Sequence, residues 1–262
     1  MKSRRQFLKV ASLSLFGLAA HSALPGVARA AEEAAKPAMP AVYRDPKGGL
    51  RGKHWGMVID TRQFDSREKF DAVINACHHY HNVPKIDGKQ EIKWIWTDGY
   101  RQTFTDQMDN YPAKEILERK YLMLCNHCVN PACVRVCPTQ ATFRRNDGIV
   151  VMDYHRCIGC RFCMAACPFG ARSFNFQDPR PFLADTNQSF PTRMRGVVEK
   201  CTFCSELLAK GQQPLCVEAS EGAIVFGDLA DPESEVRQVL AENFTIRRKP
   251  TLGTEPSVYY IL

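Results

Sequence analysis

Short apolar runs separated by glycine-containing or polar turns recur along the chain from about residue 51 onward. Two of them, Gly56–Asp60 and Gly148–Asp153, share one pattern: a glycine, a stretch of Met, Val and Ile, and a closing aspartate. β-Branched residues favour strands, so both runs predict short strands. Four residues after each aspartate stands Phe64 in the first copy and Cys157 in the second. The chain therefore contains an internal repeat.

The second copy also predicts a β-hairpin. Asn146–Gly148 is a tight-turn sequence that separates Ala141–Phe143 from Ile149–Val151. The repeating unit is therefore strand, turn, strand and cysteine run. The alternation in Ile92–Trp96 predicts a further strand, and we expect its tryptophans to pack in the interior rather than to form a docking surface.

One helix is predicted after the last cysteine. Asp231 is a suitable N-cap and Pro232 suits the first helical position. Apolar residues then follow at helical spacing at Val236, Val239 and Leu240. We expect this helix to have a packing role.

Composition and charge exclude a basic binding surface. The chain has 262 residues, 45% of them hydrophobic and 24% charged, which is ordinary for one or two globular domains. Its net charge is +7, but five of its 35 Lys and Arg residues lie in the first 30 residues, which contain no acid. Residues 31–262 thus hold 30 basic against 28 acidic side chains. Residues 31–50 contain prolines and paired glycines without apolar periodicity, which predicts a linker.

The first 30 residues have the features of an export signal. Arg4 and Arg5 begin a segment that resembles the twin-arginine signal, an apolar stretch covers Val10–Leu24, and Ala28–Ala30 resembles a cleavage site. The apolar stretch is too short for an ordinary transmembrane helix, and a retained N-terminal anchor is the competing interpretation. We expect a periplasmic mature protein that reaches the membrane only through a partner.

The twelve cysteines form runs with the spacing of iron–sulfur proteins. An exported chain would ordinarily use them in disulfides, but the twin-arginine route carries proteins already folded and loaded with cofactors. Cys157-x2-Cys160-x2-Cys163-x3-Cys167-Pro is the run of a two-cluster ferredoxin, in which the fourth cysteine binds the other cluster. A companion run begins at Cys125 and ends in Cys137-Pro138.

The exchange of fourth cysteines assigns two 4Fe-4S clusters to these runs. The first cluster has the ligands Cys125, Cys128, Cys133 and Cys167. The second has the ligands Cys157, Cys160, Cys163 and Cys137. Structural zinc also accepts four thiolates, but two interlocked runs that both end in Cys-Pro favour iron–sulfur clusters.

The other four cysteines, Cys77, Cys201, Cys204 and Cys216, predict a third 4Fe-4S cluster. The run from Cys201 has Ser220 where its fourth cysteine should stand, and the first copy of the repeat keeps only its last cysteine, Cys77. The exchange rule therefore joins Cys77 to the run from Cys201, and it assigns every missing position to one lost cluster. The alternative is a buried free Cys77 beside a cluster with three cysteine ligands.

Histidines are weaker candidates. His78, His79 and His81 stand beside Cys77, and His127 lies inside the first run. We expect them to pack or to hydrogen-bond to sulfur, with metal ligation as the alternative. The chain has no covalent-haem motif, P-loop, dinucleotide fingerprint or nucleophile elbow, and we assign no catalytic residue.

At its cysteine runs the chain resembles the iron–sulfur electron-transfer subunits of the dimethyl sulfoxide reductase and polysulfide reductase superfamily. Further matching stretches are Asp147–Arg172, Lys200–Cys204 and the closing Gly253–Tyr260. The resemblance implies an electron-transfer subunit of an oxidoreductase complex, without an active site of its own. Members usually carry four clusters, so a set of three is a departure.

The export signal and the degenerate first repeat most resemble the DsrO type within this superfamily, from the DsrMKJOP complex of dissimilatory sulfur metabolism. This resemblance implies an integral quinone-interacting membrane subunit of the DsrP or NrfD type as partner, and a multihaem cytochrome c of the DsrJ type. The alternative is a subunit of a periplasmic molybdopterin reductase or of the formate-dependent nitrite reductase system.

We therefore predict an α+β protein of tandem ferredoxin-like cluster-binding halves, with short β-hairpins and few helices. The double ferredoxin-like domain spans residues 51–228, and 229–262 form a C-terminal helix and tail. One half is local, at about 121–178. The other half is non-local and combines about 51–120 with 197–228.

Overall fold

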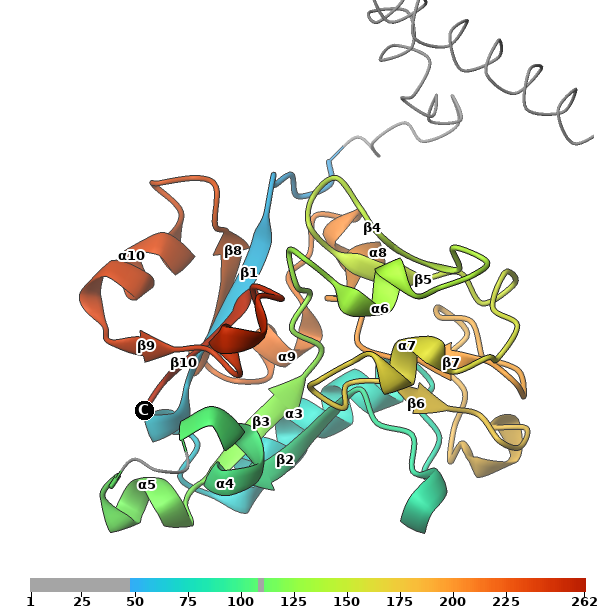
Figure 1. The fold of residues 1–262 in the computed structure, drawn as a ribbon, viewed down its shortest axis with the longest axis horizontal. Helices are drawn as coiled ribbons and strands as arrows, with labels where there is room; N and C mark the ends of the chain where they lie inside the picture. The colour runs from blue at the N-terminus through green and yellow to red at the C-terminus, as the bar shows by residue number, and fades with distance from the viewer. Residues whose placement is uncertain (1–47, 108–110) are drawn as a thin grey trace, which may run out of the picture. The chain divides into compact units, whose positions relative to one another are not determined.

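The protein is α+β, with short strand pairs and few helices (Figure 1). The computed structural model describes residues 48–107 and 111–262. The predicted signal peptide, 1–30, and residues 31–47 of the predicted linker lie outside this range. Within it, no helix combines the length and the apolar character needed to cross a bilayer.

A four-stranded sheet holds the two ends of the described chain together. Its order is β8 (Ile224–Asp228), β1 (Trp55–Asp60), β10 (Val258–Ile261) and β9 (Thr245–Ile246). β1 runs parallel to β10 and antiparallel to β8, and in Figure 1 the red C-terminal strand lies beside blue β1. The glycine of the first apolar run has a packing reason, because a Cβ at Gly56 would lie 2.3 Å from a Leu229 side-chain carbon. The predicted strand at Gly56–Asp60 is confirmed.

Three strand pairs complete the β-structure. They are β2 (Ile95–Gly99) with β3 (Lys120–Leu124), β4 (Thr142–Arg144) with β5 (Val150–Met152), and β6 (Ser173–Phe174) with β7 (Val198–Glu199). All three are antiparallel. The predicted hairpin is confirmed as β4–β5, with Phe143 opposite Val151 and with Gly148 at φ +88° in the turn.

The strand predicted over Ile92–Trp96 begins three residues late, at Ile95. The backbone N–H of Lys93 donates to Ser173 Oγ, and that of Trp94 donates to His78 Nε2. Side chains therefore accept the hydrogen bonds that these two residues would otherwise donate to a neighbouring strand. Trp94 is 1% exposed, which confirms its interior position, whereas Trp96 is only partly buried where it packs against the core.

The longest described helix is α3 (Arg67–Tyr80), and the other helices are short. They are α4 (Tyr100–Thr103), α5 (Lys114–Glu118), α6 (Ala132–Arg135), α7 (Phe162–Ala165), α8 (Ser205–Leu208), α9 (Leu215–Glu218) and α10 (Glu235–Glu242). Single 3₁₀ turns occur at Thr61–Gln63, Gly88–Gln90, Thr105–Gln107, Arg180–Phe182 and Pro250–Leu252.

The predicted start of the C-terminal helix is wrong. Asp231 accepts a hydrogen bond from the Glu233 N–H at 3.0 Å and closes a local turn, so the chain is not yet helical there. Ser234 is the N-cap residue instead, and α10 begins at Glu235. Val236, at 0% exposure, packs this helix against the sheet.

A buried ion pair fixes the crossing segment after the second cysteine run. Arg193 and Glu199 are 2.7 Å apart, and both side chains are fully buried. Arg193 also donates to the Asn82 carbonyl at 2.7 Å, and Glu199 accepts from the Trp94 indole at 3.0 Å. Removing one partner of such a pair leaves an uncompensated charge and typically costs about 3–5 kcal/mol. The crossing is thereby held against the C-terminal end of α3.

Candidate functional site

Three Cys-x-x-Cys loops have the same backbone feature. The residue before the second cysteine is left-handed in each: His127 at φ 41°, Gly159 at φ 71° and Phe203 at φ 53°. Only glycine adopts left-handed φ values without strain, so His127 and Phe203 hold a conformation that their side chains disfavour. A turn of this kind directs successive backbone N–H groups to one side, as in many iron–sulfur sites.

The third cysteine of each run occupies the second position of a four-residue helix. These cysteines are Cys133 in α6, Cys163 in α7 and Cys216 in α9. α6 packs against α7, and α9 packs against α3 (Figure 1). The first contact joins the two local runs. The second brings α3, which carries Cys77, to the run that is missing its fourth cysteine.

Two cavities are each lined by four cysteines. Cys125, Cys128, Cys133 and Cys167 line one, which we call the central site. Cys137, Cys157, Cys160 and Cys163 line the other, which we call the outer site. These are the two sets grouped above from spacing, and the binding of iron by them remains a prediction.

The third set lies in the interior and is called the inner site. Burial, followed by the charges of Cys201 and Cys216, raises the pKa of the Cys77 thiol well above its usual value. Burial and the charges of Cys216, Cys77 and Cys201 do the same for Cys204. The structure therefore brings Cys77 to three cysteines that follow it by more than 120 positions.

The raised pKa values of buried thiols indicate that the central and inner sets need a metal to become sets of thiolates. Burial raises the pKa of both Cys128 and Cys216 to about 12. Burial also acts to raise the pKa of Cys137 in the outer site. Hydrogen bonds from the Thr142 backbone and the Thr139 side chain outweigh burial there, so the pKa of Cys137 is lowered. Thiols with raised pKa values are stable as thiolates only when a bound metal replaces their protons.

Buried cations give independent support for anionic groups in these sites. Arg172 is 5% exposed and Lys200 is 0% exposed, and neither forms an ion pair with a carboxylate in the described part of the chain. Within residues 48–107 and 111–262, Lys200 donates to two acceptors, the carbonyls of Val150 and Cys201. A buried unpaired charge is very costly. Clusters held by four thiolates are anionic and would supply the missing counter-charge, so the residues present fit 4Fe-4S groups.

The histidines named above do not all behave alike. One ring nitrogen of His81 lies 2.8 Å from the Cys77 carbonyl oxygen and the other 2.9 Å from a Glu206 carboxylate oxygen. Ligand atoms of His81, Cys204 and Glu206 lie within 4.8 Å of one another, so a single metal ion would compete here with a cluster for Cys204. His127 stacks on Phe203 with ring centroids 3.7 Å apart, as expected of a packing residue.

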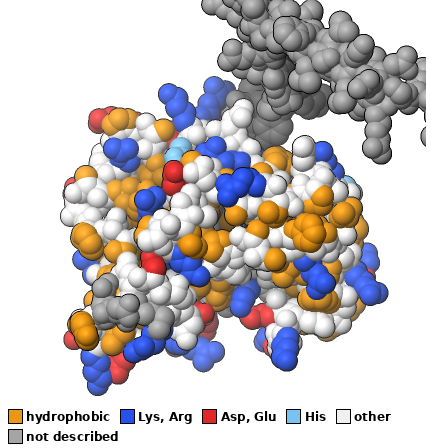
Figure 2. Space-filling view, viewed as in Figure 1, with side chains coloured by type: hydrophobic (Ala, Val, Ile, Leu, Met, Phe, Trp, Pro, Cys, Tyr) orange, Lys and Arg blue, Asp and Glu red, His pale blue; other side chains and the backbone are white. Residues whose placement is uncertain are grey.

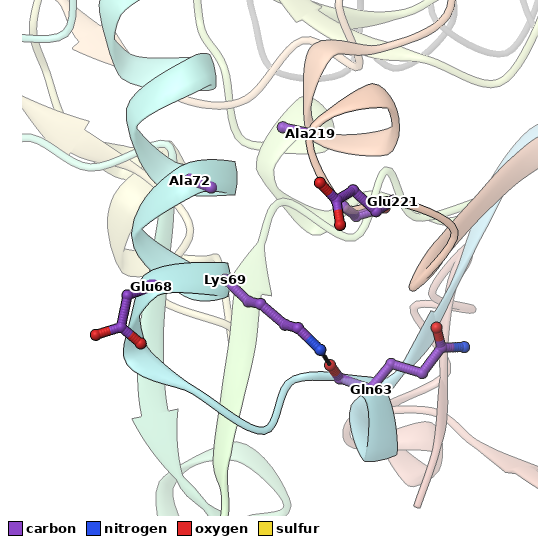
Figure 3. A pocket seen from close by; sticks show the side chains of 7 residues that line it. Gln63, Glu68, Lys69, Ala72, Ala219 and Glu221 are labelled. Carbon is purple, nitrogen blue, oxygen red and sulfur yellow. Dashed lines mark hydrogen bonds between the residues drawn. The ribbon is translucent and has the colours of Figure 1, made fainter.

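Ser220 lies where a fourth cysteine would stand, four residues after Cys216. Its hydroxyl donates to the Val217 carbonyl at 2.7 Å and accepts from the Ile224 N–H at 3.0 Å. Beside it is an open pocket between α3 and the end of α9, in which Lys69 reaches across to the Gln63 carbonyl at 3.0 Å (Figure 3). No cysteine lines this pocket, and one of its walls is formed by Glu68, Lys69 and Ala72 of the long helix α3.

The outer site meets the surface at an apolar patch. Cys160 is exposed, and its neighbours Ile158 and Phe162 are 68% and 59% exposed. The Arg161 guanidinium lies 5.4 Å from the ring centres of both Phe174 and Phe176. Figure 2 shows hydrophobic side chains gathered over the region of α7, with Lys and Arg side chains among them. Contiguous apolar surface of this kind marks contact sites for other proteins.

Sequence reasoning missed the polar residues around the sites. Arg172, Lys200 and Thr254 lay in stretches that carried the resemblance, but no spacing rule linked them to a cysteine. A lysine directly before Cys201 and an arginine five positions after Cys167 were the available signals.

Comparisons with known proteins agree with this geometry. Residues 120–179 match the 4Fe-4S dicluster domain family. The chain is 40% identical over 231 residues to the Hdr-like menaquinol oxidoreductase iron-sulfur subunit 1 of Archaeoglobus fulgidus, covering 79% of this chain and 83% of that protein. It is 38% identical over 211 residues to the B subunit of polysulfide reductase from Wolinella succinogenes, covering 80% of this chain and 94% of that protein.

A third relative is the menaquinone reductase iron-sulfur cluster-binding subunit of Nitratidesulfovibrio vulgaris. It is 36% identical over 236 residues, which cover 79% of this chain and 88% of that protein. All three relatives are named as iron–sulfur or reductase subunits. The chain therefore belongs to the family of iron–sulfur subunits that includes the Hdr-like menaquinol oxidoreductase subunit and the polysulfide reductase B subunit.

Proposed function

We propose that this protein is an electron-transfer subunit that carries three 4Fe-4S clusters, one in each set of four cysteines. The observation that carries the proposal is the gathering of all twelve cysteines into three sets of four within one fold. Each cluster, when bound, supplies one-electron redox chemistry. The protein supplies the ligands, the burial and the charges around them, and no residue is proposed to act on a substrate.

The charge interactions between thiols support a linear order of the sites. The inner and central sites are neighbours, because the charge of Cys125 acts on Cys201. The central and outer sites are neighbours, because the charge of Cys133 acts on Cys163. We therefore propose that electrons pass between the inner and outer sites through the central one.

The exposed patch at the outer site is the proposed contact for a membrane partner. Cys160 is the exposed cysteine of the twelve, and apolar side chains surround it. A centre at the surface shortens the distance to a partner's redox group. We propose an integral quinone-interacting subunit of the DsrP or NrfD type as that partner, and the relatives named for menaquinol or menaquinone support this choice.

The cellular role proposed here is dissimilatory sulfur metabolism in the periplasm. It rests on the DsrO-type resemblance, on the twin-arginine segment and on the polysulfide reductase relative. A multihaem cytochrome c of the DsrJ type is the second proposed partner. Neighbouring genes for a molybdopterin enzyme or a nitrite reductase would instead favour the alternative role in those systems.

The test is a measurement of cofactor content and electron uptake. The mature chain, purified without oxygen, should hold about twelve iron atoms and accept about three electrons from dithionite. Electron paramagnetic resonance of the reduced protein should show 4Fe-4S signals. Membranes that contain the partner subunit should reduce these clusters with menaquinol, and membranes that lack it should not. Zinc in place of iron, or reduction that is independent of the partner, would contradict the proposal.

A further inference from the structure

Two buried polar side chains in the central site make no hydrogen bond of standard geometry to the described residues. Asn126, at 1% exposure, has both its amide nitrogen and its amide oxygen unpaired. Thr254, at 6% exposure, has a hydroxyl without a hydrogen bond of standard geometry, and the interaction that it does make is with the Cys128 thiol, where it opposes the rise in pKa caused by burial. Both side chains line the cavity surrounded by the first set of cysteines. Buried polar groups nearly always have hydrogen-bond partners. The two side chains in this cavity therefore indicate an acceptor that the described residues do not supply.

The backbone holds these two side chains in place. The Asn126 carbonyl accepts from the Ser257 N–H at 2.9 Å, and the Thr254 carbonyl accepts from the Asn130 N–H at 3.1 Å. A third bond joins the Val129 N–H to the Glu255 carbonyl at 3.0 Å. The closing segment Gly253–Tyr260 is thus fastened along the loop of the first cysteine run, and it presents the Thr254 hydroxyl to the cavity from outside that loop.

A buried cation adds to the same site. The Arg172 side chain lines the cavity with Asn126 and Thr254. One guanidinium nitrogen donates to Thr142 Oγ1 at 2.8 Å, and the group also interacts with the Cys133 and Cys163 thiols. Arg172 therefore lies between the central and the outer sites, with its charge buried near both.

The outer site is built differently. Its cavity is lined by the apolar side chains of Ala141, Met152 and Val198, and its hydroxyl donor is Thr139, whose Oγ1 lies 3.7 Å from Cys137 Sγ. Cys160 of this set is exposed to water. The central site thus has two donors and the buried Arg172, a cation that it shares with the outer site. The outer site adds one hydroxyl at its edge and the exposed Arg161. The inner site has one buried hydroxyl without a partner in the described part of the chain, that of Thr202, and the cation beside it is Lys200.

We propose that Asn126 and Thr254 donate hydrogen bonds to the sulfur atoms of the central cluster and, together with Arg172, make it the strongest electron acceptor of the three. Hydrogen bonds to sulfur and nearby positive charge stabilise the reduced, more negative state and raise its reduction potential. The inference rests on the proposed electron-transfer function. Its consequence is that an electron entering from either end resides mainly in the middle of the chain of sites.

The experiment is a redox titration of the complete, iron-loaded mature chain followed by electron paramagnetic resonance. Asn126→Leu and Thr254→Val keep the shape of each side chain and remove the donor. Each substitution should lower the reduction potential of one cluster, the one that accepts the first electron, by about 59 mV. For a one-electron couple this shift is about a tenfold change in the equilibrium constant of reduction. The other two reduction steps should stay unchanged, and iron content should remain at the native value.

Thr139→Val is the matched control, because it removes a hydroxyl beside the outer site and should shift a different step. If Asn126→Leu fails to retain its cluster, Thr254→Val alone decides, since it removes only a hydroxyl group. Full iron content with all three potentials unchanged in Thr254→Val would overturn the inference while leaving the proposed function intact. Absence of 4Fe-4S signals in the native protein would instead overturn the proposed function.

Discussion

Replacement of Cys77 by alanine should remove one cluster and leave two. Cys77 is 3% exposed within α3, and the cysteine charges that act on it belong to Cys201 and Cys216. Neither four-cysteine cavity includes Cys77 among its lining residues. The loss should therefore be confined to the inner site.

The expected magnitude follows from four irons for each cluster. The native protein should contain about twelve iron atoms per chain and Cys77→Ala about eight. Because metal binding to folded ligands contributes folding free energy, the variant should also unfold at a lower temperature, with the contact between α3 and α9 loosened first.

The assay combines iron and sulfide analysis with electron paramagnetic resonance of the dithionite-reduced protein. Val73→Ala is the matched control, because Val73 is 0% exposed and lies one turn earlier on the same face of α3. It should destabilise the protein by about 2 kcal/mol through lost burial and a small cavity, and it should keep all twelve irons. A variant that is destabilised without losing iron separates a packing defect from a lost ligand.

Three results would refute the reasoning. Twelve irons in Cys77→Ala would show that Cys77 is a free thiol. Loss of signals from the central or outer site as well would show that the inner set is not independent. Sixteen irons in the native chain would show that the pocket beside Ser220 still holds a fourth cluster.

Three further predictions concern other parts of the chain. Ser220→Cys should leave the iron content unchanged, because Gln63 and Lys69 line the pocket beside it in place of cysteines; iron analysis checks this. Changing Arg4 and Arg5 to lysine should leave iron-loaded protein in the cytoplasm, since lysine lacks the planar guanidinium; cell fractionation measures the effect, and undiminished periplasmic protein would contradict it. Burial opposes ionisation of Asp228, but hydrogen bonds from the N–H groups of Lys53, Ala230 and His54 outweigh it and lower its pKa. Its carboxylate therefore contributes stability at all pH values above about 4, which is lost only as the pH falls through the lowered pKa. Asp228→Asn should accordingly cost about 1 kcal/mol in thermal unfolding, equally at pH 7 and pH 5.5, and a cost that appears only at pH 5.5 would contradict this account.

Features that depend on neighbouring residues were predictable. The β4–β5 hairpin needs only a turn at Asn146–Gly148 and β-branched residues on both sides. The grouping of Cys125–Cys137 with Cys157–Cys167 was predicted from the exchange of fourth cysteines between two neighbouring runs. The pairing of Cys77 with the run from Cys201 was also predicted from the sequence, because it follows from which positions had lost their cysteines, and iron binding by this set stays a prediction.

The start of α10 was not predictable to the residue. Asp231 and Ser234 are both suitable caps, and Pro232 favoured the earlier one. The Ser234 hydroxyl donates to the Asp228 carbonyl at 2.6 Å, at the end of β8. The end of the sheet therefore decides where the helix begins, and the local sequence does not contain that information.

The sequence alone predicted the cysteine sets and determined the local hairpin and the family, because all three depend on spacing along the chain. The tertiary structure decided that β10 pairs with β1, that Thr254 faces the central site, and that Arg172 and Lys200 are buried without carboxylate partners. These features join segments up to about 200 residues apart. No short-range pattern specifies such contacts, because they form only when packing of the whole core makes up for the conformational entropy lost in bringing distant segments together.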